Sequence, residues 1–372
     1  MSAFLIRDIA PADLDDFQKA AVHLDSVNLP DDRDALAQII DRSRRSFAAV
    51  ASGASEPPAR DRCLVFVAEE RDSGAVVGTS MIFPQHGSRK APHVYFDVLE
   101  EERYSETLDR HFAHRVLRIG YNYKGLTEVG GLVVRPEFRR HPERLGRLLM
   151  SIRFLYIARH RAAFRDEVLS ELMPPLEADG TSLLWESLGR KFTGLTYQEA
   201  DRLSQNNKEF IRALFPQDPL YASLLPARVQ ERIGQVGPDT KAVEKVLREI
   251  GFSYAHRIDP FDGGPHFQAR TDDIRLVRTT RTARVADAEI VPGASAVPAI
   301  VARERAEAPY FTAVRTSLPV EEPPGDEATV TLALAADARD VLQVAPGDEI
   351  AYLRLDRDPQ SVPAPPRRGS GG

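Results

Sequence analysis

The chain has 372 residues, more than one hydrophobic core usually organises, so two or more structural units are expected. Its formal net charge of -6 argues against nucleic-acid binding, because neutralising phosphates requires a basic face. The single cysteine, Cys63, excludes an internal disulfide and a cluster of thiolate metal ligands. No apolar stretch has the length of a signal-peptide core or a membrane span, so a cytoplasmic protein without a membrane partner is expected.

The first part of the chain predicts a strand followed by two helices. Residues 4–6 form a short apolar run, and Pro11 opens a helix with apolar residues at helical spacing. The same spacing predicts a second helix over 33–47. Residues 51–58 are rich in Ala, Ser, Gly and Pro, which indicates a loop.

Two strands and an ambiguous region come next. The apolar runs 64–69 and 75–82 are separated by Asp72-Ser73-Gly74, a pattern typical of an antiparallel hairpin. Residues 84–123 mix aromatic side chains with Arg and His, and their pattern fits a strand and a helix equally well.

A strand, an arginine-rich loop and a helix form the most informative local pattern. Residues 128–134 predict a strand that ends at Arg135-Pro136, and an amphipathic helix starts near Leu145. A helix start offers unpaired N–H groups and a positive dipole end, so this segment fits a pyrophosphate; the alternative is a solvated basic loop before an ordinary helix. The residues that would bind the anion are Arg139, Arg140, Arg144, Gly146 and Arg147.

The next part of the chain predicts short strands and helices. A strand is expected over 168–173 and a short helix over 181–189, with the only tryptophan, Trp185, in the core. An amphipathic helix is expected over 241–250, with Asp239 as its N-cap and Gly251 at its end.

Strand character returns from Phe252, and 262–265 reads as a tight turn. The composition then shifts to Ala, Val, Pro and Glu, with a linker-like turn at 323–326 followed by strands over 329–334 and 350–355. The expected organisation is a domain over 1–280, a small β-rich domain over 281–360 and a disordered tail over 361–372.

Several segments resemble known acyltransferases. The loop before Leu145 is similar to the coenzyme A loop of the GNAT superfamily, Arg/Gln-x-x-Gly-x-Gly/Ala, with Gly146 at its second glycine and Arg144 in place of the first. Longer stretches resemble the arginine N-succinyltransferases, and the likeness covers about 4–355. The stretches are 128–138, 148–149 with 153–154, 184–192, 219–221, 233–238, 258–265 and 345–348.

This resemblance implies a GNAT-like α/β (α+β) fold with a small β-rich C-terminal appendage. It implies transfer of a succinyl group from succinyl-CoA to the α-amine of L-arginine, a step of arginine catabolism, with no permanently bound cofactor. The backbone of the central strand, at Leu132, Val133 and Val134, would hold the acyl-CoA. A homo-oligomer or hetero-oligomer is expected.

The sequence departs from the family at the proposed proton donor. Gly237 stands where the family motif Gln-Val-His-Pro has its histidine, and Val27-Asn28-Leu29-Pro30 replaces a Thr-Ser-Leu-Pro pattern. General acid–base help contributes about 10²–10⁴-fold, so a rerouted reaction is compatible with this loss. Glu128, at the start of the central strand, is the candidate base, directly or through water; the alternative is a solvent-facing carboxylate at a strand end.

Four further residues are candidates for the site. His256 and His266 would replace the missing histidine, or each is structural. Asp259 and Asp262 would bind an ammonium or guanidinium group, or cap the turn at Gly263. No metal site is expected, because His111 and His114 lack a third ligand in the sequence.

Two other functions remain open at this level. One is a GNAT-type acyltransferase with a different acyl donor or acceptor. The other is a non-catalytic CoA-binding partner subunit, which Gly237 favours.

Overall fold

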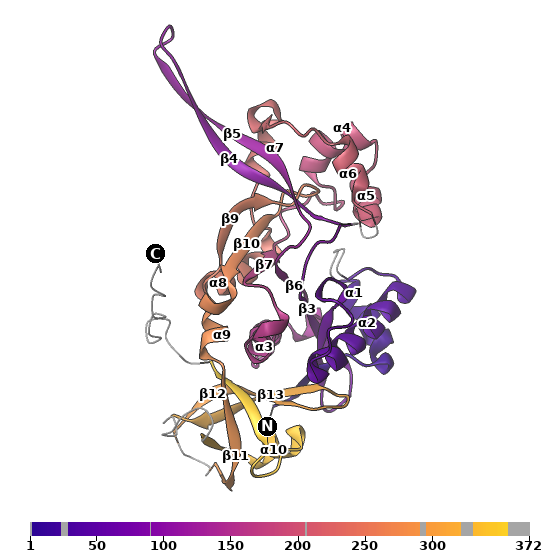
Figure 1. The fold of residues 1–372 in the computed structure, drawn as a ribbon, viewed down its shortest axis with the longest axis vertical. Coiled ribbons are helices and arrows are strands. Elements are labelled where there is room, and N and C mark those ends of the chain that lie inside the picture. The colour runs from indigo at the N-terminus through magenta and orange to yellow at the C-terminus, as the bar shows by residue number, and fades with distance from the viewer. Residues whose placement is uncertain are drawn as a thin grey trace. The chain divides into compact units, whose positions relative to one another are not determined.

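The computed structural model describes residues 2–23, 29–89, 91–204, 207–290, 295–320 and 330–355 (Figure 1). The chain divides into two compact units: unit 1 is Met1–Pro84, Val129–Asp166 and Arg270–Gly372, and unit 2 is Gln85–Glu128 and Glu167–Ala269. The expected three-part division at 280 and 360 stays a prediction. The predictions that involve residues 24–28, 323–326, 329 and 361–372 lie outside the described residues.

The strands of unit 1 combine segments that are far apart in the sequence. Strand β1 pairs antiparallel with β2 on one side and with β13 on the other, where Ile6 lies opposite Ala313. Strands β2 and β3 form the hairpin that the sequence predicts. In sheet order the strands are β14 (Thr331–Leu334), β11 (Arg281–Glu289), β15 (Glu349–Arg354), β12 (Ala296–Glu304), β13 (Phe311–Pro319), β1 (Phe4–Asp8), β2 (Leu64–Glu70), β3 (Val76–Phe83) and β6 (Thr127–Val134). The first two residues of β6, Thr127 and Glu128, belong to unit 2.

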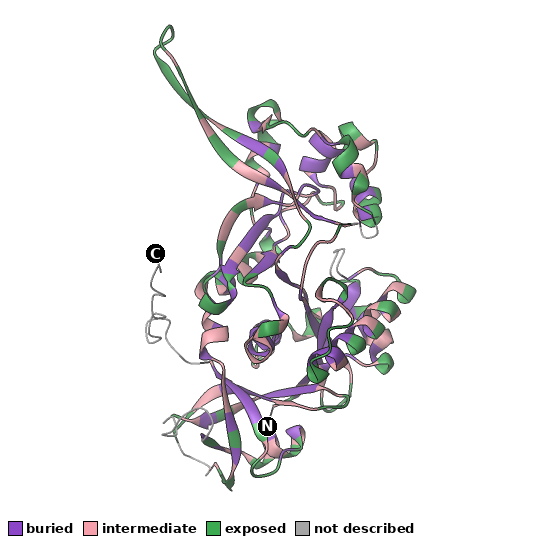
Figure 2. Cartoon of the chain, viewed as in Figure 1, coloured by how far each residue is buried: buried purple, intermediate pink, exposed green. Residues whose placement is uncertain are grey.

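The helices of unit 1 bury apolar faces. An aromatic group formed by Phe47, Phe66, Tyr156 and Phe311 has ring centroids 5.2 to 5.5 Å apart. Nearly every residue of α3 is buried, from Leu145 to Ile157 (Figure 2). The helices are α1 (Leu14–Ala21), α2 (Arg33–Ser52), α3 (Leu145–Arg159), α9 (Arg275–Thr279) and α10 (Ala336–Leu342).

Helix α2 has a well-formed cap at each end. The Asp32 carboxylate accepts a hydrogen bond from Ala35 N at 2.7 Å, and Gly53 ends the helix in the left-handed region at φ 68°. We expect Asp32→Ala to lower the free energy of unfolding by about 1 kcal/mol, since an N-terminal donor loses its partner. Chemical denaturation measures this loss. Asp34→Ala, which removes an exposed first-turn carboxylate, is the control; an equal loss in both variants would contradict the cap.

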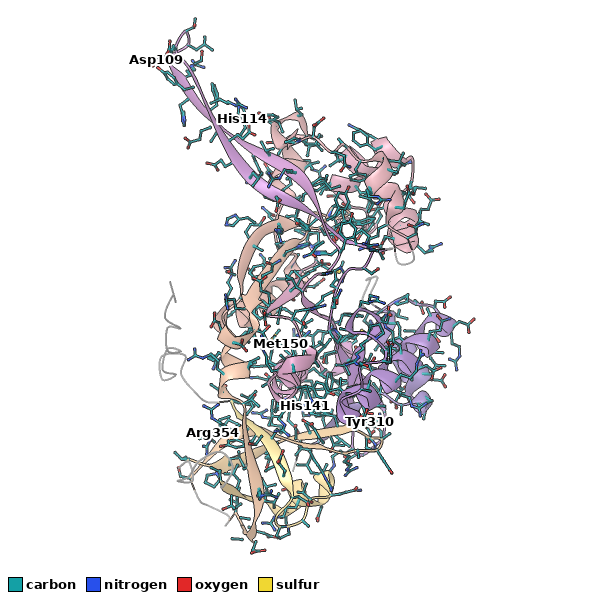
Figure 3. All side chains as sticks on the ribbon, in the orientation of Figure 1. Asp109, His114, His141, Met150, Tyr310 and Arg354 are labelled. Carbon is teal, nitrogen blue, oxygen red and sulfur yellow. The ribbon has the colours of Figure 1, made fainter. Side chains whose placement is uncertain are left out.

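The strands of unit 2 include one long hairpin. Strands β4 and β5 pair from His93–Asn122 to Ser105–Arg110. The far end of this hairpin is exposed, with His114 along it and Asp109 at its tip (Figure 3). In sheet order the strands are β7 (Glu167–Glu171), β10 (Pro265–Arg270), β9 (Ser253–Ile258), β4 (His93–Ser105), β5 (Arg110–Asn122) and β8 (Leu220–Tyr221).

Trp185 organises the core of unit 2, as predicted. Its ring stacks on Phe261 at 5.0 Å, and its indole N–H donates to the carbonyl of Leu195. The helices around this core are the π-helix Trp185–Gly189, α4 (Arg190–Thr193), α5 (Tyr197–Ser204), α6 (Glu209–Leu214), α7 (Ala227–Arg232) and α8 (Lys241–Glu249).

Most predicted elements are present, and the largest difference is at the start of α8. Asp239 is not its N-cap: Pro238–Thr240 forms a 3₁₀ turn, and Thr240 precedes the helix without a side-chain cap. Proline fixes φ near the helical value and starts the turn early. The ambiguous residues 84–123 contain the β4–β5 hairpin. Among the described residues, no helix is both long and apolar enough to cross a membrane.

Candidate active site

Strand β6 carries both the candidate base and the expected acyl-CoA position. Glu128 is its second residue and is only 2% exposed, so it is not the solvent-facing carboxylate of the alternative interpretation. Gly131 takes a left-handed φ of 53°, where a Cβ atom would lie 2.6 Å from the Met81 side chain. This glycine therefore places an irregularity in the strand directly before Leu132.

The arginine-rich loop ends at the first turn of α3, within unit 1. Arg144 has a φ of 53° and precedes the helix, and its carbonyl accepts hydrogen bonds from Arg147 N and Leu148 N. Space is open beside Gly146, since the nearest atom to a Cβ there is 3.9 Å away, on Val134. The amides of Leu145 and Gly146, which precede these two donors, thus start α3 beside open space.

The arginines of this loop differ in their contacts. Arg139, Arg140 and Arg144 are all exposed, and Arg139 also donates to the Val134 carbonyl at 3.0 Å. All eight expected acyl-CoA residues lie on β6, the loop and the start of α3: Leu132, Val133, Val134, Arg139, Arg140, Arg144, Gly146 and Arg147. Their role in acyl-CoA binding stays a prediction.

A group of titratable side chains lies within unit 2, and we call it the histidine–carboxylate cluster: His86, His93, Glu128, Glu171 and His266. Glu128 Oε2 is 2.5 Å from His86 Nδ1. Glu171 Oε1 is 3.2 Å from His93 Nε2 and 3.4 Å from His266 Nε2. The rings of His86 and His93 are 4.7 Å apart, and those of His93 and His266 are 5.2 Å apart.

Backbone contacts bring these residues together from five chain segments. His86 N donates to the Leu126 carbonyl, which aligns the segment before β4 with the chain just before β6. His93 is the first residue of β4, and Glu171 is the last residue of β7. Leu172 N donates to the Pro265 carbonyl, which holds the end of β7 beside His266 on β10.

Burial and neighbouring charges set the protonation of the cluster. Burial lowers the pKa of His266 to about 3 and lowers the pKa of His93 well below its usual value, so both imidazoles are neutral at pH 7. Burial opposes a charge on His86, but its ion pair with Glu128 outweighs this and raises the pKa of His86. Burial would raise the pKa of Glu171, yet its interactions with His266 and His86 lower it.

Asp259 and Asp262 stabilise the turn between β9 and β10. Asp259 Oδ1 accepts from Phe261 N at 2.7 Å, and Asp262 Oδ1 accepts from Gly264 N at 2.7 Å. Burial, followed by the charge of Glu171, raises the pKa of Asp259 to about 7. The capping contacts of the alternative interpretation are therefore present, and a substrate role stays a prediction.

The structure separates the two candidate histidines. His266 is 0% exposed and belongs to the cluster, together with Glu128. His256 is exposed on β9 with a φ of 53°, and its ring packs against Tyr254. Sequence reasoning missed His86, His93 and Glu171. No local signal marks them, because the fold assembles them from separate segments.

Gly237, which replaces the family histidine, is tightly enclosed by backbone. Its N–H donates to the Met173 carbonyl at 2.8 Å. A Cβ atom there would lie 2.8 Å from the Pro174 carbonyl oxygen and 2.9 Å from that of Met173. Any side chain at this position requires the backbone of 173–174 to move.

Comparisons with known proteins cover almost the whole chain. A family model described as arginine N-succinyltransferase beta subunit matches residues 4–276. The arginine N-succinyltransferase of Enterobacter sp. (strain 638) is 32% identical over 330 residues, which is 88% of this chain and 90% of the relative. That of Escherichia coli O6:K15:H31 (strain 536 / UPEC) is 31% identical over 355 residues, 94% of this chain and 97% of the relative.

A solved structure supports the same conclusion. Subunit AI of arginine/ornithine succinyltransferase from Pseudomonas aeruginosa superposes with a TM-score of 0.77 at 28% identity, over 96% of this chain and 100% of that one. The expected mixed α/β, GNAT-like fold is confirmed, and the protein is an acyltransferase. The chain belongs to the arginine N-succinyltransferase family. Neither alternative function is favoured by these likenesses.

Proposed function

We propose that this protein transfers the succinyl group of succinyl-CoA to the α-amine of L-arginine or a closely related amine. The observation that carries the proposal is the likeness to relatives named arginine N-succinyltransferase, which extends over up to 94% of the chain. It includes β6, the arginine-rich loop and the segments that form the histidine–carboxylate cluster.

The acyl-CoA is held by unit 1 in this proposal. Backbone groups of Leu132 to Val134 bind the pantetheine arm, and the first-turn amides of α3 bind the pyrophosphate. Arg140 and Arg144 add positive charge at that position in a chain whose net charge is -6. This local basic patch is what an anionic co-substrate requires.

Glu128 is the proposed base of the reaction. The α-ammonium must lose one proton before its nitrogen attacks the thioester carbonyl, and Glu128 accepts that proton directly or through a water. The new amide bond forms as the C–S bond breaks, and CoA leaves as a thiolate. The second proton, which the nitrogen loses as it becomes an amide, goes to water or to that thiolate. A free thiol has a pKa of about 8.5, so the thiolate leaves without obligatory protonation by an acid.

The remaining candidates have more restricted roles. Burial lowers the pKa of His266 to about 3, so at pH 7 this imidazole is a weak base and has no imidazolium proton to give. Asp259 offers a carboxylate oxygen near Glu171 and His266, where it would receive a cationic substrate group together with Asp262. His256 remains a weaker candidate because it is exposed and the cluster does not include it.

Product analysis tests the proposal directly. The full-length protein is incubated with succinyl-CoA and L-arginine, L-ornithine or another amine, with acetyl-CoA as the alternative donor. We expect mass spectrometry to detect an N-succinyl product, with one free CoA released for each product formed. Binding of succinyl-CoA in calorimetry without any product would reject the amine acceptors, and absence of binding would reject the proposal.

The exposed loop arginines predict a salt-sensitive affinity for the donor. We expect the double variant Arg140→Ala/Arg144→Ala to raise the KM for succinyl-CoA about tenfold or more, because each lost charge-assisted hydrogen bond costs about 1.5–3 kcal/mol. Steady-state kinetics at two salt concentrations measure this change. The control is Arg110→Ala, which removes an exposed arginine from β5. An unchanged KM in the double variant would place the pyrophosphate elsewhere.

A further inference from the structure

Two close atoms in the histidine–carboxylate cluster lack the geometry of a hydrogen bond. His93 Nε2 is 3.2 Å from Glu171 Oε1, yet among the described residues it has no hydrogen-bond partner, although His93 is only 2% exposed. In a hydrogen bond, the N–H would point at the oxygen. Two metal ligands instead direct their lone pairs at the metal ion, which lies between them.

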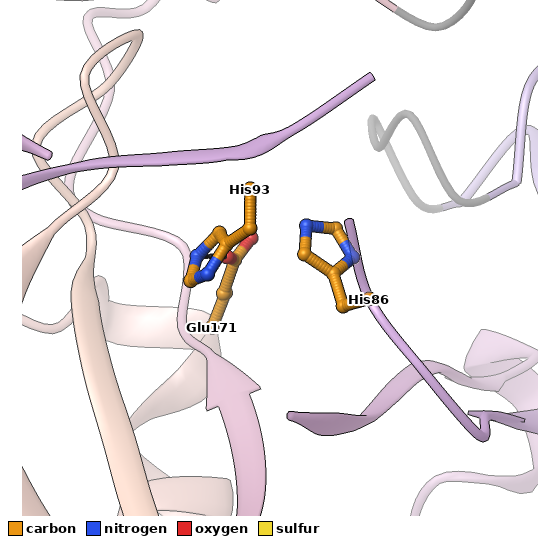
Figure 4. A group of neighbouring side chains, drawn as sticks. All are labelled: His86, His93 and Glu171. Atoms are coloured by element: carbon orange, nitrogen blue, oxygen red, sulfur yellow. Dashed lines mark ion pairs between the residues drawn. The ribbon is translucent and has the colours of Figure 1, made fainter. Parts of the chain in front are cut away.

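The distances in the cluster fit this second arrangement. For metal–ligand bonds of about 2.0–2.1 Å, two ligands of a tetrahedral site are about 3.3 Å apart. The distance between His93 Nε2 and Glu171 Oε1 is 3.2 Å. His86 also offers a ring nitrogen, and one donor atom from each of these three residues lies within 4.8 Å of the others. Figure 4 shows the His86 ring on one side and the His93 ring beside the Glu171 carboxylate on the other.

The contact of His86 supports the same interpretation. Its Nδ1 faces the Glu128 carboxylate, which is 97% buried as a side chain and 2.5 Å away. A carboxylate on one nitrogen of a histidine fixes the ring and raises the basicity of the other nitrogen, an arrangement common around zinc. Nε2 of His86 is therefore the nitrogen left to bind an ion.

A second possible ligand set, Glu171, Asp259 and His266, fits less well. Asp259 already accepts hydrogen bonds from Phe261 N and Asp262 N through Oδ1. It has no counterpart of the Glu128–His86 pair to orient a ligand. The side chains of His86 and Glu171 are 22% and 29% exposed, which leaves the first set accessible to an ion from solvent.

We propose that His86, His93 and Glu171 form a binding site for a divalent transition-metal ion of the zinc type. Two imidazole nitrogens and one carboxylate oxygen are borderline donors that suit Zn²⁺ or Co²⁺ better than Mg²⁺ or Ca²⁺. Three protein ligands leave one position of a tetrahedral ion open to water or another small donor. None of the three ligands is among the residues proposed for acyl-CoA, amine or proton transfer, and all three belong to unit 2.

Metal titration of the full-length protein tests this site without acyl-CoA or amine. After chelator treatment, we expect one Zn²⁺ per chain in calorimetry, with a dissociation constant in or below the micromolar range. Co²⁺ should give the intense visible bands of a tetrahedral site with nitrogen ligands. The double variant His86→Gln/His93→Gln should weaken Zn²⁺ binding by at least about 100-fold, and Glu128→Gln by about 10- to 100-fold.

The matched control is His111→Gln, which removes an exposed histidine that lies 3.4 Å from Glu102. It should leave binding unchanged. Equal affinity of the wild type and the double variant would overturn the proposal, as would an octahedral Co²⁺ spectrum of the wild type. Circular dichroism checks whether the double variant folds. If it does not fold, the Co²⁺ spectrum of the wild type still tests the proposed site. Loss of succinyl transfer with intact Zn²⁺ binding would reject the proposed function and leave the metal site standing.

Discussion

Glu128→Gln is expected to lower kcat for succinyl transfer by about 10²–10⁴-fold, because an amide cannot take the proton that the attacking ammonium must lose. The amide has nearly the same shape as the carboxylate and is still able to hydrogen-bond to His86. KM for succinyl-CoA should change little, since the donor-binding residues lie elsewhere on β6 and on α3. The measurement is steady-state release of CoA at saturating amine.

Two controls make the result specific to the base. Glu167→Gln removes an exposed carboxylate from the start of β7 and should leave kcat unchanged. Metal-depleted wild type is assayed beside the variant, since Glu128 also contacts His86. A kcat for Glu128→Gln within about threefold of the wild type would exclude Glu128 as the base. An equal loss of kcat on metal depletion alone would show that Glu128 acts through the metal site and not as the base.

Elements whose packing follows from local pattern could be predicted from the sequence. Helix α2 has helical periodicity, although it continues to Ser52, past the predicted end at 47, and strands β2 and β3 are apolar runs around a glycine-containing turn. The order of the strands could not be predicted in this way. The pairing of β1 with β13 joins residues about 300 positions apart, and no local periodicity specifies a partner at that distance.

The β4–β5 hairpin shows why residues 84–123 were ambiguous. Near their far ends both strands are exposed, so the alternation of buried and exposed residues that identifies a strand is missing. Leu108 and Phe112 lie there with charged neighbours and no apolar core behind them. Strands β4 and β5 therefore stay paired past the residues whose apolar pattern would identify them as strands.

The candidate site was predictable only where one segment carries several functional residues. Glu128 and Leu132 lie on a single strand, so the sequence brings these two candidates together: the resemblance implies Leu132, and its place at the start of the strand suggests Glu128. His86, His93 and Glu171 come from three segments that only the sheet brings together. His256 and His266 looked equivalent in the sequence, but the register shift between Pro265 and Phe267 and the left-handed φ of His256 give them different environments.

The second large effect we expect is a loss of stability when the family histidine is restored at Gly237. Gly237→His should lower the free energy of unfolding by about 1–3 kcal/mol, because its Cβ meets the carbonyl oxygens of Met173 and Pro174 at less than 3.0 Å. These are backbone atoms, so a change of side-chain rotamer cannot relieve the contact. Thermal and chemical denaturation measure the loss, and Gly237→Ala should show the same direction with a smaller size.

The matched control is Gly146→Ala, at a helical glycine whose nearest neighbour would be 3.9 Å from the new Cβ. That variant should keep or gain stability by up to about 1 kcal/mol. Met173 lies two residues after Glu171, so a backbone shift at 173–174 also disturbs the histidine–carboxylate cluster. Turnover should therefore fall with stability in Gly237→His rather than rise. A variant as stable as the wild type with faster turnover would show that the missing histidine limits this enzyme, and that the chain around Gly237 accommodates it.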